Sequence, residues 1–355
     1  MVSLTRPQGD DYKITYQYSI TWLQNKWACP SPGTNFFKAL KILKLARRRS
    51  PDPPGKACPS ILQKLNMITK RTKFIHLYTT VILLGLCIFL FSLDWRSSHR
   101  ELTFAILDVG QGDALFIESP TGTQVLLDGG PPRKILGRLA QIMPSFDRTI
   151  DAIIMSHPDA DHISGFSDVL SSYKVGEIFE SGIATDSKIY QNIKNEAERQ
   201  KIASILARRG MRLSLGGGVV IDILFPDGYV YDWETNTGGI VAKLSYGDTS
   251  VMLAGDAPTV TEKMILAETS VEFLKSAMLK TGHHGSRTSS SPEFVQAVSP
   301  RYAFLSAGKE NTYGHPHQEV LGLLYQVGAR IFRTDLEGTI IMKSDGKKER
   351  FFFYE

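Results

Sequence analysis

The stretch that most constrains this chain is Ser156–His162, where two histidines and two aspartates fall within six residues. It follows the apolar run Ala152–Met155, which predicts a buried strand. A tight loop at a strand end that gathers imidazoles and carboxylates offers mixed nitrogen and oxygen ligands. Such ligands suit Zn²⁺, Mn²⁺ or iron better than Ca²⁺ or Mg²⁺. We therefore expect a metal site here, rather than a polar surface loop whose histidines point into water.

Two glycine-flanked loops further along the chain carry more histidines. One contains His283 and His284 just after a predicted strand, and the other contains His315 and His317. Together the three loops hold six of the eight histidines, and no histidine lies between residues 163 and 282. Glycine lets the backbone pass close to a ligand. This distribution indicates that the three loops form one shared site.

Two aspartates end predicted strands in a comparable way. Asp128 closes the strand predicted at 124–128, and Asp256 follows the second strand of a hairpin that turns at Gly247. Folds of the α/β class place ligands at the ends of strands. We therefore include both aspartates in the candidate site.

Charge is distributed unevenly along the 355 residues. Residues 1–100 carry 16 Lys and Arg against 4 Asp and Glu, a net charge of +12, whereas residues 101–355 carry 25 against 32, a net charge of −7. A basic front suits an anionic membrane surface or nucleic acid, and an acidic back half with clustered Asp and His suits metal binding. All three cysteines lie before residue 100, so no disulfide partner is evident in the back half.

The front of the chain divides into two segments. Residues 1–73 form a basic region that we expect to be partly disordered, with an amphipathic helix at 34–49 that either lies on a membrane surface or packs on protein. Residues 74–93 are an uncharged, largely apolar run of 20 residues, long enough to cross a bilayer as one helix. More basic residues precede this run than follow it, which predicts a single-pass location in the cell membrane with the back half outside the cytoplasm. Alternatively, translation begins at Met67 and residues 1–66 are not part of the protein.

From Leu102 the pattern becomes that of a globular domain, which we assign to residues 101–355. Strands are predicted at 102–108, 114–118 and 124–128, and later at 219–225, 240–246 and 250–254. Helices are predicted at 132–143, 164–173 and 188–209, and helices alternate with strands from residue 259 to the end. Two series of strands, each followed by helix–strand alternation, fit an α/β fold of two mixed sheets packed face to face with helices outside.

Several motifs resemble those of one family in their order and spacing. They are Asp108–Ala114, Leu127–Gly130, Ser156–Gly165, Leu253–Asp256, Gly282–Ser286, Tyr313–Pro316 and Arg333–Thr339. Together they resemble the metallo-β-lactamase-fold domain of ComEC-type competence proteins, from about Leu102 to the C-terminus. The apolar run before the domain is similar to the last membrane segment of such proteins. Their other membrane helices have no counterpart in this sequence, which speaks against DNA transport by this chain alone.

The resemblance implies an αββα metallo-β-lactamase sandwich, preceded by the single transmembrane helix, with two divalent metal ions. His157 and Asp159 would hold one ion, Asp161 and His162 would hold the other, and Asp256 would bridge them. The superfamily's additional histidine between the first motif and the bridging aspartate has no counterpart here. The ligands would then be richer in oxygen, which favours Mn²⁺ alongside Zn²⁺.

The later histidine loops leave a choice for the last metal ligand, because His315 and His283 compete for it. We expect His315 to be the ligand, with His283 or His284 beside the substrate as an acid or oxyanion donor. Lys280 and Ser286 would also help to stabilise the departing oxygen at the substrate.

Two aspartates receive supporting roles from the same resemblance. Asp161 would orient the attacking hydroxide in addition to binding metal. Asp128 would orient the histidine loop through hydrogen bonds; the alternative is an ordinary aspartate that ends a strand at a turn.

The sequence as a whole predicts a membrane-anchored, metal-dependent hydrolase. We expect a phosphodiesterase or nuclease that acts on DNA in a competence-like DNA-uptake setting, with the membrane, single-stranded DNA and a separate competence channel protein as partners. One alternative is a hydrolase of a small or envelope-linked phosphoester. The other is a non-catalytic module that binds DNA or a protein partner, which the missing histidine and the net charge of −7 favour.

Overall fold

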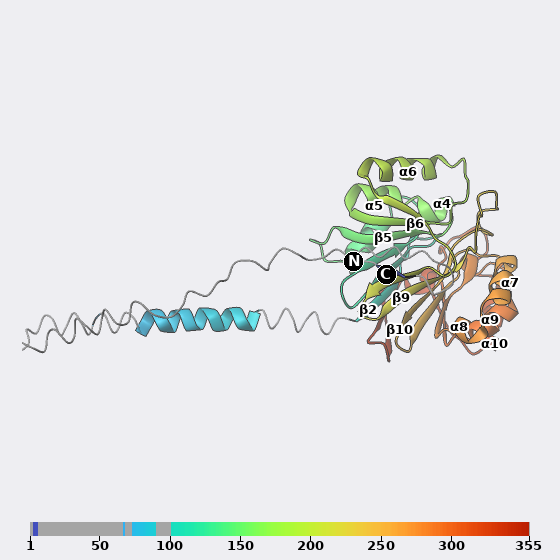
Figure 1. Ribbon diagram of the computed structural model, residues 1–355. Helices are drawn as coiled ribbons and strands as arrows, with labels where there is room; N and C mark the ends of the chain where they lie inside the picture. Colours follow the sequence, from blue (N-terminus) through green and yellow to red (C-terminus); the bar gives the residue numbers. More distant parts are fainter. Residues whose placement is uncertain (1–2, 6–66, 68–72, 90–100, 355) are drawn as a thin grey trace, which may run out of the picture. The chain divides into compact units, whose positions relative to one another are not determined.

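The computed structural model describes residues 3–5, 67, 73–89 and 101–354 (Figure 1). The chain divides into two compact units, one formed by Met1–Lys13 with Trp95–Glu355 and the other by Ile14–Asp94. The predicted amphipathic helix at 34–49 lies outside the described residues.

In the second of these units, residues 73–89 form a helix that covers most of the apolar run. Its large apolar side chains are exposed, for example Ile82 at 67%. No helix in the described part of the chain is both long enough and apolar enough to cross a membrane. The structure therefore does not support the predicted transmembrane helix at 74–93, the last four residues of which lie outside the described ranges.

The first of two eight-stranded sheets in the larger unit has the order β16-β15-β2-β3-β4-β5-β6-β7. Neighbours from β16 to β4 pair antiparallel, and neighbours from β4 to β7 pair parallel. Its strands are β2 (Leu102–Ile106), β3 (Leu115–Glu118), β4 (Gln124–Leu127), β5 (Thr149–Met155), β6 (Lys174–Glu180), β7 (Ala203–Leu206), β15 (Thr339–Ser344) and β16 (Glu349–Tyr354).

The second sheet has the order β1-β8-β9-β10-β11-β12-β13-β14. It repeats the pattern of the first, because β1 to β11 pair antiparallel and β11 to β14 pair parallel. Its strands are β1 (Ser3–Thr5), β8 (Arg212–Gly216), β9 (Val219–Phe225), β10 (Val241–Tyr246), β11 (Thr249–Leu253), β12 (Met278–Lys280), β13 (Tyr302–Leu305) and β14 (Arg330–Arg333).

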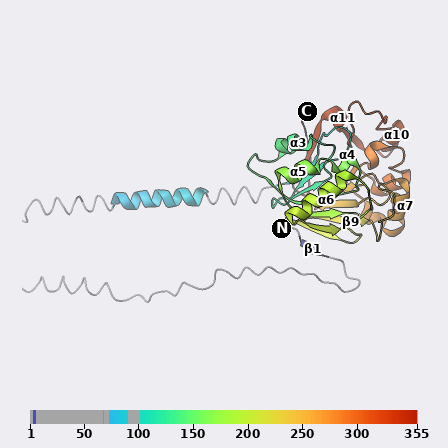
Figure 2. The ribbon, with the colours of Figure 1, turned by 90° about the horizontal axis from the view of Figure 1, so that it is seen from above.

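Helices cover the outer faces of the two sheets, as Figures 1 and 2 show from two directions. With the first sheet lie α3 (Ile135–Ile142), α4 (Ala160–Ile163), α5 (Phe166–Ser172) and α6 (Lys188–Gln200). With the second lie α7 (Thr259–Glu268), α8 (Val271–Leu274), α9 (Pro292–Val298) and α10 (Gln318–Gln326). Two short elements complete the unit, the 3₁₀ helix η1 (Gly282–Gly285) and α11 (Thr334–Glu337).

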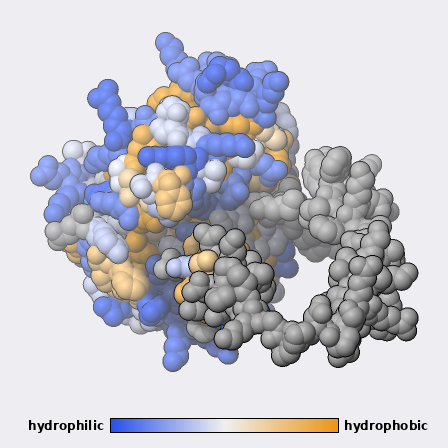
Figure 3. Space-filling model, turned by 90° about the vertical axis from the view of Figure 1, so that its left-hand side faces the viewer, coloured by the Kyte–Doolittle hydropathy of each residue, from blue (hydrophilic) through white to orange (hydrophobic). Residues whose placement is uncertain are grey.

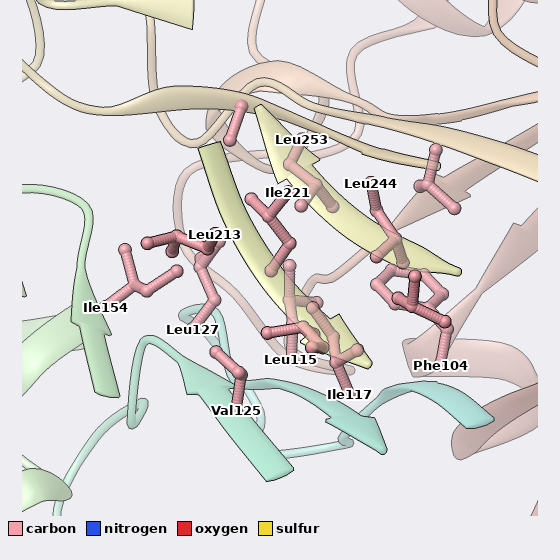
Figure 4. Close-up of a cluster of buried hydrophobic side chains, with 14 of the residues drawn as sticks. Phe104, Leu115, Ile117, Val125, Leu127, Ile154, Leu213, Ile221, Leu244 and Leu253 are labelled. Atoms are coloured by element: carbon pink, nitrogen blue, oxygen red, sulfur yellow. The ribbon is translucent and has the colours of Figure 1, made fainter. Parts of the chain in front are cut away.

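The main core lies between the two sheets (Figure 4). Leu115 and Ile154 of the first sheet meet Ile221 and Leu253 of the second in one cluster of buried side chains. Two more apolar clusters fill the spaces between each sheet and its helices, whereas the face of the unit seen in Figure 3 is largely hydrophilic. Removing apolar surface from water stabilises such layers by about 25 cal/mol per Å². The prediction of two mixed sheets packed face to face with helices outside is confirmed.

One predicted helix is wrong in its length. The helix expected at 188–209 ends at Gln200, because Lys201 adopts the left-handed conformation with φ 59° and closes the helix. The chain then forms β7, which pairs parallel with β6 at the edge of the first sheet. Ile205 of this strand packs against the core between the sheets. Tertiary packing therefore overrides the helical pattern in this stretch.

The topology brings the motif loops of the first sheet together at one edge. β4 and β5 are parallel neighbours, with Leu127 opposite Ile154, so the turns that follow them emerge side by side. The turn between β2 and β3 packs against the same place, because a Cβ on Gly112 would lie 2.1 Å from the carbonyl oxygen of Asp161. Only glycine allows that approach.

Candidate metal centre

Side chains that can bind metal converge from both sheets at the ends of their parallel strands. His157 and His162 come from the turn after β5, Asp256 follows β11, and His284 lies in η1 after β12. Among the described residues, four groups of ligand atoms lie within 4.8 Å of one another: His157 with His162 and Asp256, Asp161 with His162 and His284, Asp113 with Asp256 and His284, and Asp113 with Asp128 and His162.

Asp256 lies at the middle of this arrangement. Its Oδ2 is 3.2 Å from Nε2 of His162 and 3.6 Å from Nε2 of His284. The corresponding distances to Nε2 of His283 and His157 are 3.7 and 3.9 Å. One carboxylate oxygen that faces four imidazole nitrogens has the placement that a bridging ligand needs.

Several atoms of the cluster have no hydrogen-bond partner although they are buried. They are Nε2 of His157, His162 and His284 and Oδ1 of Asp256. Buried polar atoms are nearly always satisfied, so four such atoms in one cluster need an explanation. Divalent cations satisfy both imidazole nitrogens and carboxylate oxygens. The residues present therefore fit a metal centre.

The remaining acidic residues of the histidine turn lie at the mouth of the cluster. Asp159 Oδ2 is 3.6 Å from Nε2 of His157, and Asp161 Oδ2 is 3.3 Å from Nε2 of His284. Both side chains are about two-fifths exposed, at 38% and 41%. They can contact a bound ion from the solvent side, as the predicted ligand roles require.

Asp128 supports the histidine turn from behind. It is fully buried, and its two oxygens accept hydrogen bonds from the backbone N–H and hydroxyl of Ser156 at 2.9 and 2.7 Å. Its Oδ2 also lies 2.9 Å from Nδ1 of His162, which leaves Nε2 of that ring for the cluster. Asp128 itself adopts φ 59°, a left-handed conformation that Asp tolerates better than most residues. This geometry matches the predicted supporting role rather than that of an isolated turn residue.

A fully buried ion pair that the sequence analysis missed lies behind His284. Lys280 Nζ is 2.7 Å from Oδ2 of Asp113, and both side chains are at most 1% exposed. Asp113 Oδ1 is 3.4 Å from Nδ1 of His284, which also contacts the backbone oxygen of Ser306 at 2.9 Å. Asp113 comes from the first sheet and Lys280 from the second. The pair therefore links the two sheets behind the metal cluster.

This ion pair corrects the predicted role of Lys280. Its ammonium group is buried and also donates to the backbone oxygen of Thr281, so it does not face a substrate. Ser286 is likewise 4% exposed, with its hydroxyl bonded to that of Thr288. Both residues lie in the structural support of the loop rather than on its accessible side.

The two adjacent histidines of η1 point to different surroundings. His284 is buried with Nε2 in the cluster, whereas His283 is 29% exposed and its Nδ1 lies 3.3 Å from the hydroxyl of Thr288. Both adopt positive φ, 47° and 55°, which is uncommon outside glycine and turns neighbouring side chains in different directions. The geometry gives the ligand position to His284 and leaves His283 beside the accessible space.

His315, the ligand preferred from the sequence, lies further from the cluster. Its ring centroid is 5.6 Å from that of His283 and 6.3 Å from that of His284, and it belongs to none of the ligand groups found among the described residues. Burial and the neighbouring imidazoles lower its pKa to about 4. His317 lies behind it, with the two ring centroids 5.0 Å apart.

The opposite charges of the cluster shift one another's pKa values. Burial disfavours the charged ring of His162, but the carboxylates of Asp256 and Asp128 outweigh it, so the pKa of His162 lies well above its usual value. Burial is likewise outweighed at His284 by Asp256 and Asp113, and the pKa of His284 rises to about 9. Burial would raise the pKa of Asp256, yet the imidazoles hold it well below its usual value. Metal cations would take the place of these protons.

Comparison with known proteins follows the same motifs. The profile described as "Metallo-beta-lactamase superfamily" matches residues 107–309. "ComE operon protein 3" of Bacillus subtilis (strain 168) is 30% identical over 314 residues, 83% of this chain and 39% of the relative. "Competence protein ComA" of Neisseria gonorrhoeae is 29% identical over 247 residues, 68% of this chain and 32% of the relative.

A third relative is "Recombination protein 2" of Haemophilus influenzae (strain ATCC 51907 / DSM 11121 / KW20 / Rd), which is 31% identical over 265 residues, 73% of this chain and 31% of the relative. The chain therefore spans only a third or so of the length of these curated relatives. The resemblance to ComEC-type competence proteins is confirmed.

Proposed function

The chain belongs to the metallo-beta-lactamase superfamily as a metal-dependent hydrolase with ComEC-type relatives, and we propose that the bond it cleaves is a phosphodiester of DNA. One observation supports this most directly: Asp256 shares its Oδ2 among imidazoles from both sheets and belongs to two groups of ligand atoms, one with His157 and His162 and the other with Asp113 and His284. Paired metal sites of this kind are suited to the in-line displacement at phosphorus. The competence and recombination proteins among its relatives favour DNA as the polymer.

The geometry supports one assignment of the residues that would hold the metal ions. His157, Asp159 and Asp256 face one side of the cluster, and Asp161, His162 and His284 complete the other, with Asp256 between them. When bound, two divalent cations would supply a nucleophilic water at neutral pH and Lewis acidity toward the phosphoryl oxygens.

The protein's own side chains would position and protonate the reacting groups. Asp128 fixes the ring of His162 through Nδ1, and Asp113 with Ser306 fixes that of His284. His283 is the partly exposed imidazole with Nε2 3.7 Å from Asp256, so it is placed to donate a proton or a hydrogen bond to a departing oxygen. Such a group typically contributes about 10²–10⁴-fold to a rate.

The test uses the full chain, purified and loaded with Mn²⁺ or Zn²⁺. Single-stranded DNA and a chromogenic phosphodiester are assayed in parallel, with Asp256→Ala as the inactive reference. Cleavage of both substrates supports the proposal. Turnover of the small diester alone would instead identify a hydrolase of small phosphoesters, and metal binding without turnover of either would identify a non-catalytic module.

The cellular setting is a separate part of the proposal. We place the chain at the cell membrane, with its metal domain outside the cytoplasm and a separate competence channel protein as partner. Support comes from the uncharged run at 74–93 and from the exposed apolar side chains of the helix at 73–89. A reporter enzyme fused after residue 98 should be active outside the cytoplasm; activity inside would refute this orientation without affecting the chemistry.

A further inference from the structure

The last strand of the described chain exposes aromatic side chains at the edge of the first sheet. Among the described strands, β16 has a partner on one side only, and Phe352, Phe353 and Tyr354 are 39%, 43% and 47% exposed. Successive side chains of a strand point to opposite faces. Phe352 and Tyr354 therefore share the outer face, while Phe353 points to the inner face and contacts Phe332.

A groove of about 250 Å³ runs beside these two rings on the outer face. Its apolar wall includes Phe352, Tyr354, Ile341 and Ile142, and its polar wall includes Lys343 and Glu118. It lies wholly within the larger unit, between α3 and the hairpin of β15 and β16. The two aromatic rings are about 7 Å apart along the strand and give the apolar wall a flat surface opposite the polar wall.

The hairpin that carries this wall differs in charge from the domain around it. Residues 339–354 contain Lys343, Lys347, Lys348 and Arg350 against Asp345 and Glu349, a net charge of +2. Residues 101–355 together have a net charge of −7. Of these cations, Lys343 lines the groove beside the exposed rings, whereas Arg350 is paired with Glu101. A cation next to exposed rings is the combination that attracts polyanions with flat bases.

Helix α3 connects this groove to the metal cluster. Arg133 and Lys134 are exposed just before its first residue, a few positions after Asp128, and Ile142 at its other end lines the groove. Eight helical residues span about 12 Å. In the β15–β16 hairpin, Tyr354 pairs with Thr339. The hydroxyl of Thr339 accepts a hydrogen bond from the backbone N–H of Asp108, in the loop that follows β2. The two exposed cations therefore lie at one end of α3 and the aromatic wall lies at the other.

We propose that this groove binds single-stranded nucleic acid, with bases stacked on Phe352 and Tyr354 and phosphates on the nearby cations along α3 and the hairpin. Exposed aromatic rings accept any base by stacking, and basic side chains follow the backbone. A duplex keeps its bases paired inside, so the groove selects single strands. The inference rests on the proposed function in one respect, that the bound strand is the one presented to the metal cluster.

The first experiment measures binding apart from catalysis. The full chain, stripped of metal with a chelator, is titrated into fluorescein-labelled 20-mer oligo-dT and the matching oligo-rU, and anisotropy gives the dissociation constant. Phe352→Ala with Tyr354→Ala should raise the dissociation constant at least tenfold, since removal of one stacking ring weakens binding about 5- to 150-fold. Phe352→Leu with Tyr354→Leu should do the same while keeping the apolar wall. A preference between the two oligomers distinguishes DNA from RNA as the strand.

The matched control is Tyr325→Ala, which removes a 67% exposed ring from α10 on the second sheet. Binding should be unchanged in this variant. A charge variant, Arg133→Ala with Lys134→Ala, should reduce the slope of log affinity against log salt by about 1.4, because each phosphate contact to a single strand contributes about 0.7.

Failure of this inference and failure of the proposed function give different results. Wild-type protein that hydrolyses the chromogenic diester but does not bind the oligomers would overturn the groove and leave the hydrolase intact. Binding without any hydrolysis would support the groove and refute the proposed function. Equal affinity in the wild type and both aromatic variants would overturn the groove, as would equal weakening in the Tyr325 control. A wild-type dimer that the aromatic variants convert to monomers would also overturn it, because the occupant would then be a second copy of the chain.

Discussion

The two sheets contribute to the metal cluster in different ways. The first supplies His157, Asp159, Asp161 and His162 from one short turn after β5, whereas the second supplies Asp256 and the η1 histidines from separate loops after β11 and β12. A contiguous turn fixes the relative positions of its side chains locally. Separate loops do so only once the sheet has formed, so the second half of the site depends on tertiary packing.

The two halves also differ in the residues that orient their histidines. His162 is held by Asp128, which belongs to the same sheet. His284 is held by Asp113, which reaches it from the other sheet and is itself paired with Lys280. The half that is assembled from separate loops is therefore also the half that is tied to the opposite sheet. This difference can be tested by changing one half at a time.

The largest expected effect comes from the carboxylate that both halves share. Asp256→Ala should reduce turnover to background and lower the bound metal, because Oδ2 of this residue faces four imidazole nitrogens. Metal analysis by mass spectrometry after gel filtration measures the content. Asp248→Ala, an exposed aspartate in the turn of the same hairpin, is the control. An unchanged content of two ions in Asp256→Ala would refute the shared role.

The next effect separates the histidines of the second half. His284→Ala should lose one metal ion per chain, because its Nε2 lies in the cluster, and turnover should fall with it. His283→Ala should keep both ions while single-turnover rates fall by about 10²–10⁴. His315→Ala should keep its metal, since its ring lies outside the ligand groups. If His315→Ala loses an ion and His284→Ala keeps both, the ligand assigned from the sequence is the correct one.

A smaller effect concerns the ion pair that joins the sheets. Asp113→Asn should lower the free energy of unfolding by about 3–5 kcal/mol, because it leaves the Lys280 charge buried without its partner. Metal affinity should also fall, by about 10–100-fold, since His284 loses a support. Urea denaturation and metal titration measure the two quantities.

Two further variants give the comparison its controls. Adding Lys280→Met to Asp113→Asn should recover part of the stability, because it removes the unpaired charge. Asp222→Asn breaks a partly exposed pair with Arg212 and should cost no more than about 1 kcal/mol. Equal losses in Asp113→Asn and Asp222→Asn would mean that burial of the first pair has no special effect.

The smallest expected effect is that the thermal stability of the metal-free protein depends on pH. The pKa of His284 is raised to about 9 in the folded protein, so its charged form stabilises the fold below the unfolded value near 6.5. That contribution is lost as the pH rises from about 6.5 through 9. Thermal melts with chelator present should therefore fall over this range. With metal bound, the histidine is neutral throughout, and a parallel decline in the loaded protein would contradict this account.

The fold was predictable from the sequence where local pattern and tertiary packing agree. The strands near 102–106, 115–118 and 124–127 have alternating or continuous apolar runs that end at glycine turns, and the structure contains them with only small changes in their ends. The prediction was wrong at residues 203–206, because pairing with β6 overrides their helical pattern. An edge strand is decided by its neighbour, which no local window contains.

The candidate site was predictable to a similar degree. The spacing of histidines and aspartates at 156–162 was enough to predict these residues as metal ligands. The structure brings His157 and His162 together, with ring centroids 4.1 Å apart. Asp113 was not recognised although it lies in a glycine-rich motif, because a single buried carboxylate next to glycine has no distinctive spacing. Lys280 was predicted to contact the substrate because it is close in sequence to the η1 histidines. Its side chain instead pairs with Asp113, which comes from the opposite sheet.

By itself, the sequence determined the α/β class, the three histidine loops and the group of residues from which metal ligands are drawn. Periodicity and short-range spacing carry that information, because they depend on neighbours within a few positions. Only the tertiary structure placed His284 rather than His315 in the groups of ligand atoms, revealed the Asp113–Lys280 pair and placed the aromatic edge strand beside α3. These features depend on contacts between residues far apart in the sequence, such as Asp113 and Lys280, which are 167 positions apart. Such contacts exist only after the chain has folded.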